Sequence, residues 1–540
     1  MKFKAFAIQL CLFLGCTFSL SAFSYVHVND SGSKVVYDFV VDSVKFEAKN
    51  IDGNTFTAAN LVGVDGYTGI LYEVGSPEVP VIRLNVAADS AEGIQVTTRT
   101  YFAKSNLQIH GEFKPVLESL EKVAGARYEI YHNGHFKSMM SYPAKDFQIR
   151  EIGQVRGQKM FEVTLFPVQF VGATNQMNIT RSYQVEVQKI AEEKAGTPDG
   201  IVFVVGAKFK NSAGLKKYMA KKTATGLEVL QFDATGLTPD QIRKKIKDLY
   251  AVKKNLKYVL IIGDDTDVPA MESDTISGIT DHYYASIDTS DYATDIQTPD
   301  LFVGRISAES VAQLETILLK YTRYIDGDFS NRGWMSHVSF LATDDRWELA
   351  EGTHNYVIDT YTNSHHYTGA FPAAEQAGGD KLYAVTYNAG ETEVMQSLLA
   401  GRSIVNYSGH GANTFWDAPR VTQDDVRSLS KSSSLPFVIS NACITGDFRV
   451  DESFAETWQR SEWGSVMYWG SMDSTYWDED DVLERRMFDG IFTGGKTTFG
   501  SITDFALREM AKFYGGSGRS DYYFETYHMF GDPSIALRIQ

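Results

Sequence analysis

The chain has 540 residues, of which 43% are hydrophobic and 13% aromatic, and it carries a formal net charge of −17 at pH 7. That length exceeds what one hydrophobic core can organise, so two or more domains are expected. The apolar content excludes a disordered chain. The negative charge argues against a nucleic-acid-binding protein, because a polyanion would be repelled at long range.

Residues 1–24 have the pattern of a secretory signal peptide. Lys2 and Lys4 precede an apolar run, and residues 22–24 supply small side chains where a signal peptidase cuts. We therefore expect a secreted or periplasmic protein whose mature chain has no transmembrane span. Two alternatives stay open: the run anchors the chain in a membrane, or Cys16 is acylated within an imperfect lipoprotein box.

Residues 25–195 predict a β-rich N-terminal domain. Short alternating or branched runs, such as "KVVYDFVVDSVKFEA" and "QKMFEVTLFPVQFVG", are separated by turn residues. One segment differs, because Pro115 to Ala126 has the spacing of a helix. A linker rich in charged and small residues follows at 189–200, where Lys189 and Lys194 offer basic cleavage points.

Residues 200–540 predict an α/β domain with a mostly parallel sheet flanked by helices. Apolar strand-like blocks alternate with amphipathic segments, which is typical of a sheet covered on both faces. The blocks are 201–205, 227–233, 258–264, 336–344, 381–388, 403–409, 436–440 and 465–471; the helical segments are 238–254, 307–325 and 391–400.

Two of the predicted strands end at reactive side chains, His410 in "VNYSGHG" and Cys443 in "FVISNACITGDF". Because the carboxyl ends of adjacent parallel strands meet at one edge, we expect the imidazole to activate the thiol for attack on a carbonyl. The backbone N–H groups of Gly411 and Cys443 would stabilise the resulting oxyanion. Cys443 is the only cysteine left after removal of the signal peptide. The chain has no G-x-S-x-G or H-E-x-x-H motif, which disfavours a serine hydrolase and a zinc peptidase.

The motif "NYSGHG", followed 33 residues later by the Cys of "NACITGDF", resembles the gingipain family of cysteine peptidases, which share a clan with caspases, legumain and clostripain. The pieces "YVLIIGDDTDVP", "DLFVGRISAES" and "MFGDPSIALRI" agree with it. The resemblance implies a caspase-like fold and a secreted cysteine endopeptidase that acts on protein or peptide substrates. It also implies a zymogen whose own pro-segment, 25–195, is the inhibitor of a peptidase domain at 200–540.

The resemblance also assigns a third catalytic residue. It places a carboxylate after the strand that ends in "LATDD", where Asp345 is the first choice and Asp344 the alternate. Such a carboxylate would orient the histidine. Either residue could instead cap the following helix.

For the substrate, the resemblance makes Trp477 the aromatic wall of the specificity pocket. Glu351 or Asp473 would lie under an Arg or Lys side chain, because burying an unpaired charge is costly. Ordinary surface acids and a half-buried tryptophan are the alternatives. No cofactor is required for the chemistry, and the Asp-rich segment 288–300 is a candidate for a structural calcium ion, although it does not match an EF-hand loop.

A different class of function stays open on the sequence alone. A non-catalytic relative would bind proteins, and a sorting relative would act as a transpeptidase. The presence of Cys443, His410 and Asp345 together favours the hydrolase.

Overall fold

The computed structural model describes residues 26–98, 105–109, 111–131, 138, 141–190, 198–429 and 434–539. The predicted signal peptide and most of the predicted linker lie outside these ranges. Within them, none of the helices has the length and apolar character needed to cross a bilayer.

The N-terminal part, up to residue 190, consists of antiparallel sheets around a core of its own. Alternating sequence produces these strands, with buried apolar residues on one face and polar residues on the other. In spatial order the sheets are β1 (Val26–Asp30), β2 (Lys34–Val40), β13 (Ser182–Gln188) and β7 (Ile94–Thr98); β5 (Thr68–Ile70), β6 (Pro80–Ala87), β10 (Gln158–Leu165) and β9 (Phe147–Val155); β11 (Val168–Val171), β12 (Gln176–Ile179) and β8 (Ser105–Gln108); and β3 (Ser43–Ile51) with β4 (Asn54–Val62).

The helix predicted for Pro115 to Ala126 is wrong. The segment is extended up to a turn at its end, where the Val123 N–H bonds Glu121 and the Ala126 N–H bonds Val123, and its other paired N–H and C=O groups bond to other parts of the chain. Lys122 and Leu120, for example, pair with residues 475 and 477. Tertiary hydrogen bonding of this kind overrides a weak helical propensity.

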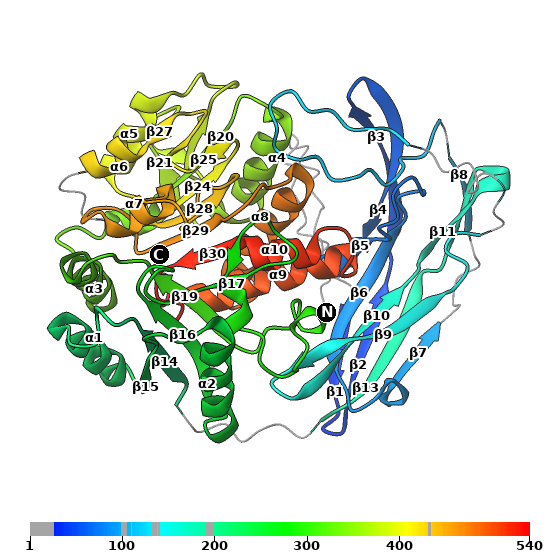
Figure 1. Cartoon of the computed structure of the whole chain (residues 1–540). Coiled ribbons are helices and arrows are strands. Elements are labelled where there is room, and N and C mark those ends of the chain that lie inside the picture. The colour runs from blue at the N-terminus through cyan, green and yellow to red at the C-terminus, as the bar shows by residue number, and fades with distance from the viewer. Residues whose placement is uncertain are drawn as a thin grey trace, which may run out of the picture.

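The C-terminal part is built on one sheet of ten strands (Figure 1). The order is β15 (Glu228–Asp233), β14 (Gly200–Val205), β16 (Leu256–Ile262), β19 (Phe302–Ile306), β30 (Tyr527–Phe530), β29 (Met467–Ser471), β28 (Phe437–Asn441), β24 (Ile404–Ser408), β20 (Val338–Ala342) and β23 (Asp380–Tyr383). All neighbouring pairs are parallel except β29 with β30. The expected mostly parallel sheet is confirmed.

Helices cover both faces of this sheet, as its continuous apolar strands require. In β14, Ile201, Phe203 and Val205 pack in the cluster that includes α1 and α3, whereas Val202 and Val204 pack in the cluster that includes α2. The helices are α1 (Ala213–Ala224), α2 (Pro239–Val252), α3 (Val311–Asp326), α4 (Trp347–Val357), α5 (Glu391–Ala400), α6 (Gln423–Ser428), α7 (Phe454–Arg460), α8 (Trp477–Phe492), α9 (Phe499–Tyr514) and α10 (Ser520–Thr526).

Three small sheets lie in the loops of the described residues. They are β17 (Met271–Glu272) with β18 (Ile279–Thr280), β21 (Thr368–Gly369) with β22 (Gln376–Ala377), and β25 (Gly411–Ala412), β26 (Phe415–Trp416) and β27 (Val421–Thr422). The last of these begins directly after His410.

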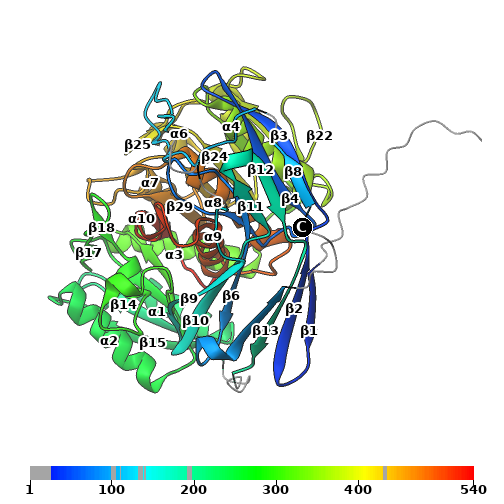
Figure 2. The same cartoon turned by 90° about the vertical axis from the view of Figure 1, so that its right-hand side faces the viewer.

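The two parts pack side by side, and α9 lies between the ten-stranded sheet and strands β5 and β6 (Figures 1 and 2). Arginines make several of the polar contacts across this boundary. The buried Arg83 of β6 donates to the Phe513 carbonyl at 2.6 Å, and Arg346 of the C-terminal part pairs with Asp52 at 2.7 Å. At the β9–β10 turn, Arg156 donates its N–H to Asp300 and its guanidinium to the Leu256 carbonyl.

Candidate active site

Three adjacent strands deliver the candidate catalytic side chains to one edge of the sheet. β28, β24 and β20 are neighbours and parallel, and Cys443, His410 and Asp345 each follow one of them. The expectation that His410 and Cys443 come from adjacent parallel strands is confirmed.

His410 is held at both ring nitrogens. Its Nε2 lies 2.9 Å from Asp345 Oδ2, and its Nδ1 lies 3.1 Å from the Lys122 carbonyl oxygen. A carboxylate at Nε2 fixes the ring plane and favours a proton there. Asp344, the alternate, has its carboxylate at the Thr343 hydroxyl instead.

Cys443 lies beside the same carbonyl. Its Sγ accepts the Thr475 N–H at 3.2 Å and lies 3.9 Å from the Lys122 oxygen. Burial raises the pKa of the thiol above its ordinary value, and the Thr475 N–H acts in the opposite direction by stabilising the thiolate. The thiol is therefore protonated at neutral pH while this segment covers it.

Residues 119–122 of the N-terminal part lie along the site as an antiparallel strand. The Lys122 N–H donates to the Thr475 carbonyl, and the Trp477 N–H donates to the Leu120 carbonyl, both at 2.9 Å. Glu121 forms an antiparallel bridge with Tyr476 between these two bonds. Main-chain pairing of this kind is how an extended peptide adds to an exposed edge.

The side chain of Lys122 enters a closed pocket. Its Nζ lies 2.6 Å from Asp480 Oδ2, donates to the Asn441 carbonyl at 2.6 Å, and lies 4.6 Å from the centre of the Trp477 ring. Neither Lys122 nor Asp480 has appreciable exposed side-chain surface. Tyr527 donates its hydroxyl to the other oxygen of Asp480 at 2.6 Å. The ammonium is thus matched by a carboxylate, a carbonyl and an aromatic face.

Trp477, predicted as the pocket wall, separates this pocket from the histidine. The His410 and Trp477 rings meet edge to face with their centres 5.6 Å apart. One indole therefore contacts the ammonium and the imidazole.

The two acids predicted for the pocket do not lie at the ammonium. Glu351 accepts from the Thr386 N–H and hydroxyl, and so ties α4 to the loop after β23. Asp473 accepts the Ser277 N–H at 2.6 Å. The acid that contacts Lys122 is Asp480, three residues after Trp477 on α8.

Gly411, a predicted oxyanion donor, lies against the backbone of Cys443. A Cβ at position 411 would come within 2.7 Å of Thr445 Cγ2 and 3.0 Å of the Cys443 carbonyl oxygen. Only glycine fits this approach, and the role of the Gly411 N–H as an oxyanion donor stays a prediction.

Sequence reasoning missed Lys122, Thr475, Asn441 and Asp480. A signal for Asp480 was present, because residues three apart on a helix share a face, and Trp477 and Asp480 have that spacing. Lys122 carried no such signal, since it lies in a segment that resembles a helix.

The Asp-rich segment 288–300 contacts the N-terminal part. Asp288 accepts the Gly157 N–H, and Asp300 accepts the Arg156 N–H. Across the described ranges, no three His, Cys, Asp or Glu side chains are grouped to hold a metal ion. The calcium ion stays a prediction.

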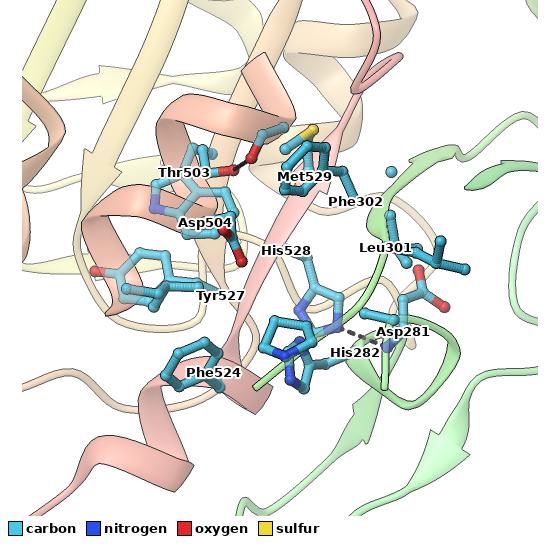
Figure 3. A pocket seen from close by; sticks show the side chains of 17 residues that line it. Asp281, His282, Leu301, Phe302, Thr503, Asp504, Phe524, Tyr527, His528 and Met529 are labelled. Atoms are coloured by element: carbon cyan, nitrogen blue, oxygen red, sulfur yellow. Dashed lines mark hydrogen bonds between the residues drawn. The ribbon is translucent and has the colours of Figure 1, made fainter. Parts of the chain in front are cut away.

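A second pocket lies away from Cys443, and its buried histidines are hydrogen-bonded within the core (Figure 3). Its volume is about 60 Å³, too small for a peptide. His528 accepts the Asp281 N–H at Nε2 and bonds the Thr526 carbonyl through Nδ1, and His282 bonds the Ile296 carbonyl. Burial lowers the pKa of both histidines, to about 4 for His282. Neutral, bonded imidazoles of this kind indicate structure and not catalysis.

Sequence comparison matches both parts of the chain. Peptidase family C25 matches residues 195–538, and the family described as Propeptide_C25 matches residues 26–208. Lys-gingipain of Porphyromonas gingivalis is 24% identical over 589 residues, which cover 94% of this chain and 32% of that protein. Gingipain R1 of the same species is 24% identical over 562 residues, covering 93% of this chain and 53% of that protein. The chain therefore spans about a third to a half of the length of these relatives.

Two solved structures share the fold. The crystal structure of the Arg-specific cysteine proteinase gingipain R has a TM-score of 0.54 and 24% identity, and covers 64% of this chain and 80% of its own. The complex of the pro- and mature domains of P. gingivalis RgpB has a TM-score of 0.52 and 23% identity, and covers 63% and 79% respectively.

Proposed function

Because the chain belongs to peptidase family C25, we propose that it is a cysteine endopeptidase, made as a zymogen, which hydrolyses the peptide bond after a lysine. One observation carries the proposal. The chain's own Lys122 has its side chain in a matched pocket and its carbonyl oxygen between His410 Nδ1 and Cys443 Sγ.

In the open enzyme, the Lys carbonyl carbon of a substrate takes the place of the Lys122 carbonyl carbon. His410 accepts the thiol proton of Cys443 at Nδ1, and the thiolate attacks that carbon. Asp345 stabilises the imidazolium through Nε2. The backbone N–H groups of Gly411 and Cys443 receive the oxyanion.

Collapse of the tetrahedral intermediate breaks the C–N bond, and His410 returns the proton to the leaving amine. A thioester then links the lysine carbonyl to Cys443. A water molecule, deprotonated by His410, hydrolyses the thioester and restores the thiol.

Residues 26–190 act as the inhibitor in this proposal. The Lys122 carbonyl oxygen accepts a hydrogen bond from Nδ1 of His410, so that nitrogen is not free to take the thiol proton, and burial favours the protonated thiol. Removal of this part frees both groups. The residues predicted as a signal peptide lie outside the described ranges, and export of the chain is part of the same proposal.

The geometry favours lysine over arginine. A single ammonium satisfies both Asp480 and the Asn441 carbonyl at 2.6 Å. A guanidinium is longer and planar, and it needs a fork-shaped partner that these two acceptors do not form. The gingipains named above include a Lys- and an Arg-specific protein, so family membership alone does not decide between lysine and arginine as the residue before the cleaved bond.

The test uses the full chain, activated by cleavage in the linker, and a peptide library whose products are sequenced by mass spectrometry. Cleavage after lysine by the wild type and none by Cys443→Ala is expected. Uncut peptides with the wild type, or equal cleavage by Cys443→Ala, would overturn the proposal. N-terminal sequencing of the active species should read a start between about residues 190 and 205.

A further inference from the structure

The first turn of α8 contacts residues 119–122 along their whole length. Trp477 bonds the main chain of Leu120, Asp478 bonds the same residue, Glu479 bonds Ser119, and Asp480 bonds Lys122. The Lys122 pocket belongs to the proposed function. Asp478 and Glu479 do not contact Lys122, so the pocket for the lysine side chain does not explain their contacts with residues 119 and 120.

Asp478 bonds the main chain of Leu120, which lies where the third residue before the cleaved bond of a substrate would lie. Its Oδ2 accepts the Leu120 N–H at 3.0 Å, while the Trp477 N–H donates to the Leu120 carbonyl at 2.9 Å. Both polar groups of one peptide residue are therefore held by two consecutive residues of α8. A proline in this place would have no N–H to donate and would leave Asp478 Oδ2 without this donor, while Oδ1 accepts the Tyr128 hydroxyl of the N-terminal part at 2.9 Å.

Glu479 contacts the side chain of Ser119, which lies where the fourth residue before the cleaved bond would lie. It is completely buried, and its Oε1 accepts the hydroxyl hydrogen of Ser119. Its Oε2 has no hydrogen-bond partner among the residues that the structure describes. A buried carboxyl oxygen without a donor is rare in folded proteins. The site therefore has the capacity to accept another donor beyond the one that serine supplies.

There is room for a longer side chain beside Ser119. A cavity of about 270 Å³ at the boundary of the two parts is lined by Ser119, Tyr72, Asp478 and Tyr514, among others. Most of its lining, Tyr72 included, belongs to the N-terminal part, so the space beside Asp478 and Tyr514 is no longer enclosed once that part leaves.

We propose that α8 carries two further subsites of the same peptidase. Asp478 requires a main-chain N–H at the third residue before the cleaved bond. Glu479 selects a hydrogen-bond-donating side chain at the fourth, such as serine, threonine, an amide or a basic residue, over an apolar one. This inference rests on the proposed cleavage after lysine.

The test compares four peptides that end in lysine before a fluorogenic amide: Ser-Leu-Glu-Lys, Ala-Leu-Glu-Lys, Gln-Leu-Glu-Lys and Ser-Pro-Glu-Lys. With the processed wild type, alanine in place of serine should lower kcat/KM about fivefold, the effect of one net hydrogen bond. Glutamine should match or exceed serine. Proline should lower kcat/KM by about tenfold or more, because a buried acceptor loses its donor.

Variants assign these effects to residues. Glu479→Ala should cleave the serine and alanine peptides equally, and Asp478→Ala should reduce the penalty for proline. Asp473→Asn, whose carboxylate bonds Ser277 and does not contact 119–122, should keep the wild-type ratios. Ratios within one variant do not depend on how much of it folds, and the wild-type comparison stands even if a variant is inactive.

The outcomes separate the two proposals. If no lysine peptide is cleaved, the proposed function fails. If all four lysine peptides are cleaved at equal rates, the function stands and the two subsites are overturned.

Discussion

At the scale of residues, a single buried ammonium decides the specificity of the proposed peptidase. Four acids follow one another at 478–481, yet only Asp480 reaches Lys122. The choice depends on where α8 begins, since a helix that starts at Trp477 turns position 480 to the same side. Sequence patterns identified His410 and Cys443 because each ends an apolar strand. They could not identify Asp480, because the start of a helix is defined by its neighbours in space.

Replacing Asp480 with Asn should abolish the preference for lysine. Losing one partner of a buried ion pair costs about 3–5 kcal/mol, so kcat/KM for lysine peptides should fall at least ~100-fold. Glu351→Gln and Asp473→Asn are matched controls that should stay near wild type, because neither carboxylate lies at the ammonium. If Glu351→Gln or Asp473→Asn loses lysine cleavage and Asp480→Asn keeps it, the pocket has been assigned to the wrong acid.

Replacing His410 with Ala should slow hydrolysis at least ~100-fold, the lower end of general acid–base contributions. Alkylation of Cys443 by iodoacetamide in the processed enzyme should slow as well, because the imidazole maintains the thiolate. Cys443→Ala supplies the unlabelled blank. Equal labelling rates with and without the imidazole would show that the two groups do not interact.

At the scale of elements, the strand at residues 119–122 is the one that sequence reasoning misjudged. Residues 115–126 have helical spacing, but the open edge of the 475–477 loop supplies hydrogen-bond partners that an isolated helix would have to provide itself. The eight predicted blocks of the ten-stranded sheet all contain strands, because long apolar runs are strongly specified. β19 and β30 were not predicted as strands; β30 follows α10 without an intervening turn, so no turn residue marks its start, and the length of β19 does not distinguish it from the strands that were predicted.

The same strand makes the closed state sensitive to pH. Burial, helped by the neighbouring charge of Asp478, raises the pKa of Glu479 to about 8, while the Ser119 hydrogen bond acts in the opposite direction. Burial also raises the pKa of Asp478. A carboxyl whose pKa is raised in the closed state binds a proton there. Closure is therefore strongest below the ordinary pKa near 4.5 and weakens as the pH rises toward 8.

Separation of the two parts should accordingly increase with pH. The Cys443→Ala chain, cut in the linker by an added protease, can be followed by size-exclusion chromatography from pH 5 to pH 9. The dissociation constant should rise by up to about tenfold per pH unit for one proton released. Glu479→Gln should flatten the curve. A dissociation constant that falls with pH would contradict this account.

On the scale of the whole molecule, the N-terminal part binds at places far from the thiol. Arg83 contacts the end of α9, and Arg346 reaches out to Asp52. The Arg156 turn bonds Asp300 and the Leu256 carbonyl. These contacts distribute the affinity of closure over the whole boundary, so the active-site strand need not supply all of it.

Arg156→Ala should therefore loosen closure without altering the catalytic residues. Hydrogen bonds from a charged donor contribute about 1.5–3 kcal/mol, so the cut chain should show at least ~10-fold weaker association. Lys159→Ala is the control on the same hairpin, since among the described residues the Lys159 side chain pairs only with Glu151 on the adjacent strand. The linker-cut mixture of each chain is titrated with a lysine peptide. Identical inhibition in both would show that the turn contributes nothing.

The continuous chain from residue 190 to residue 198 gives the seated Lys122 a further consequence. In the uncut molecule the lysine meets its pocket at an effective concentration set by the tether, typically millimolar, whatever the amount of protein. After the cut, occupancy depends on the real concentration of the two pieces relative to their dissociation constant. Dilution then becomes the trigger. At high concentration the two pieces of the proposed zymogen stay associated and inhibited, and at low concentration they dissociate and the peptidase becomes active.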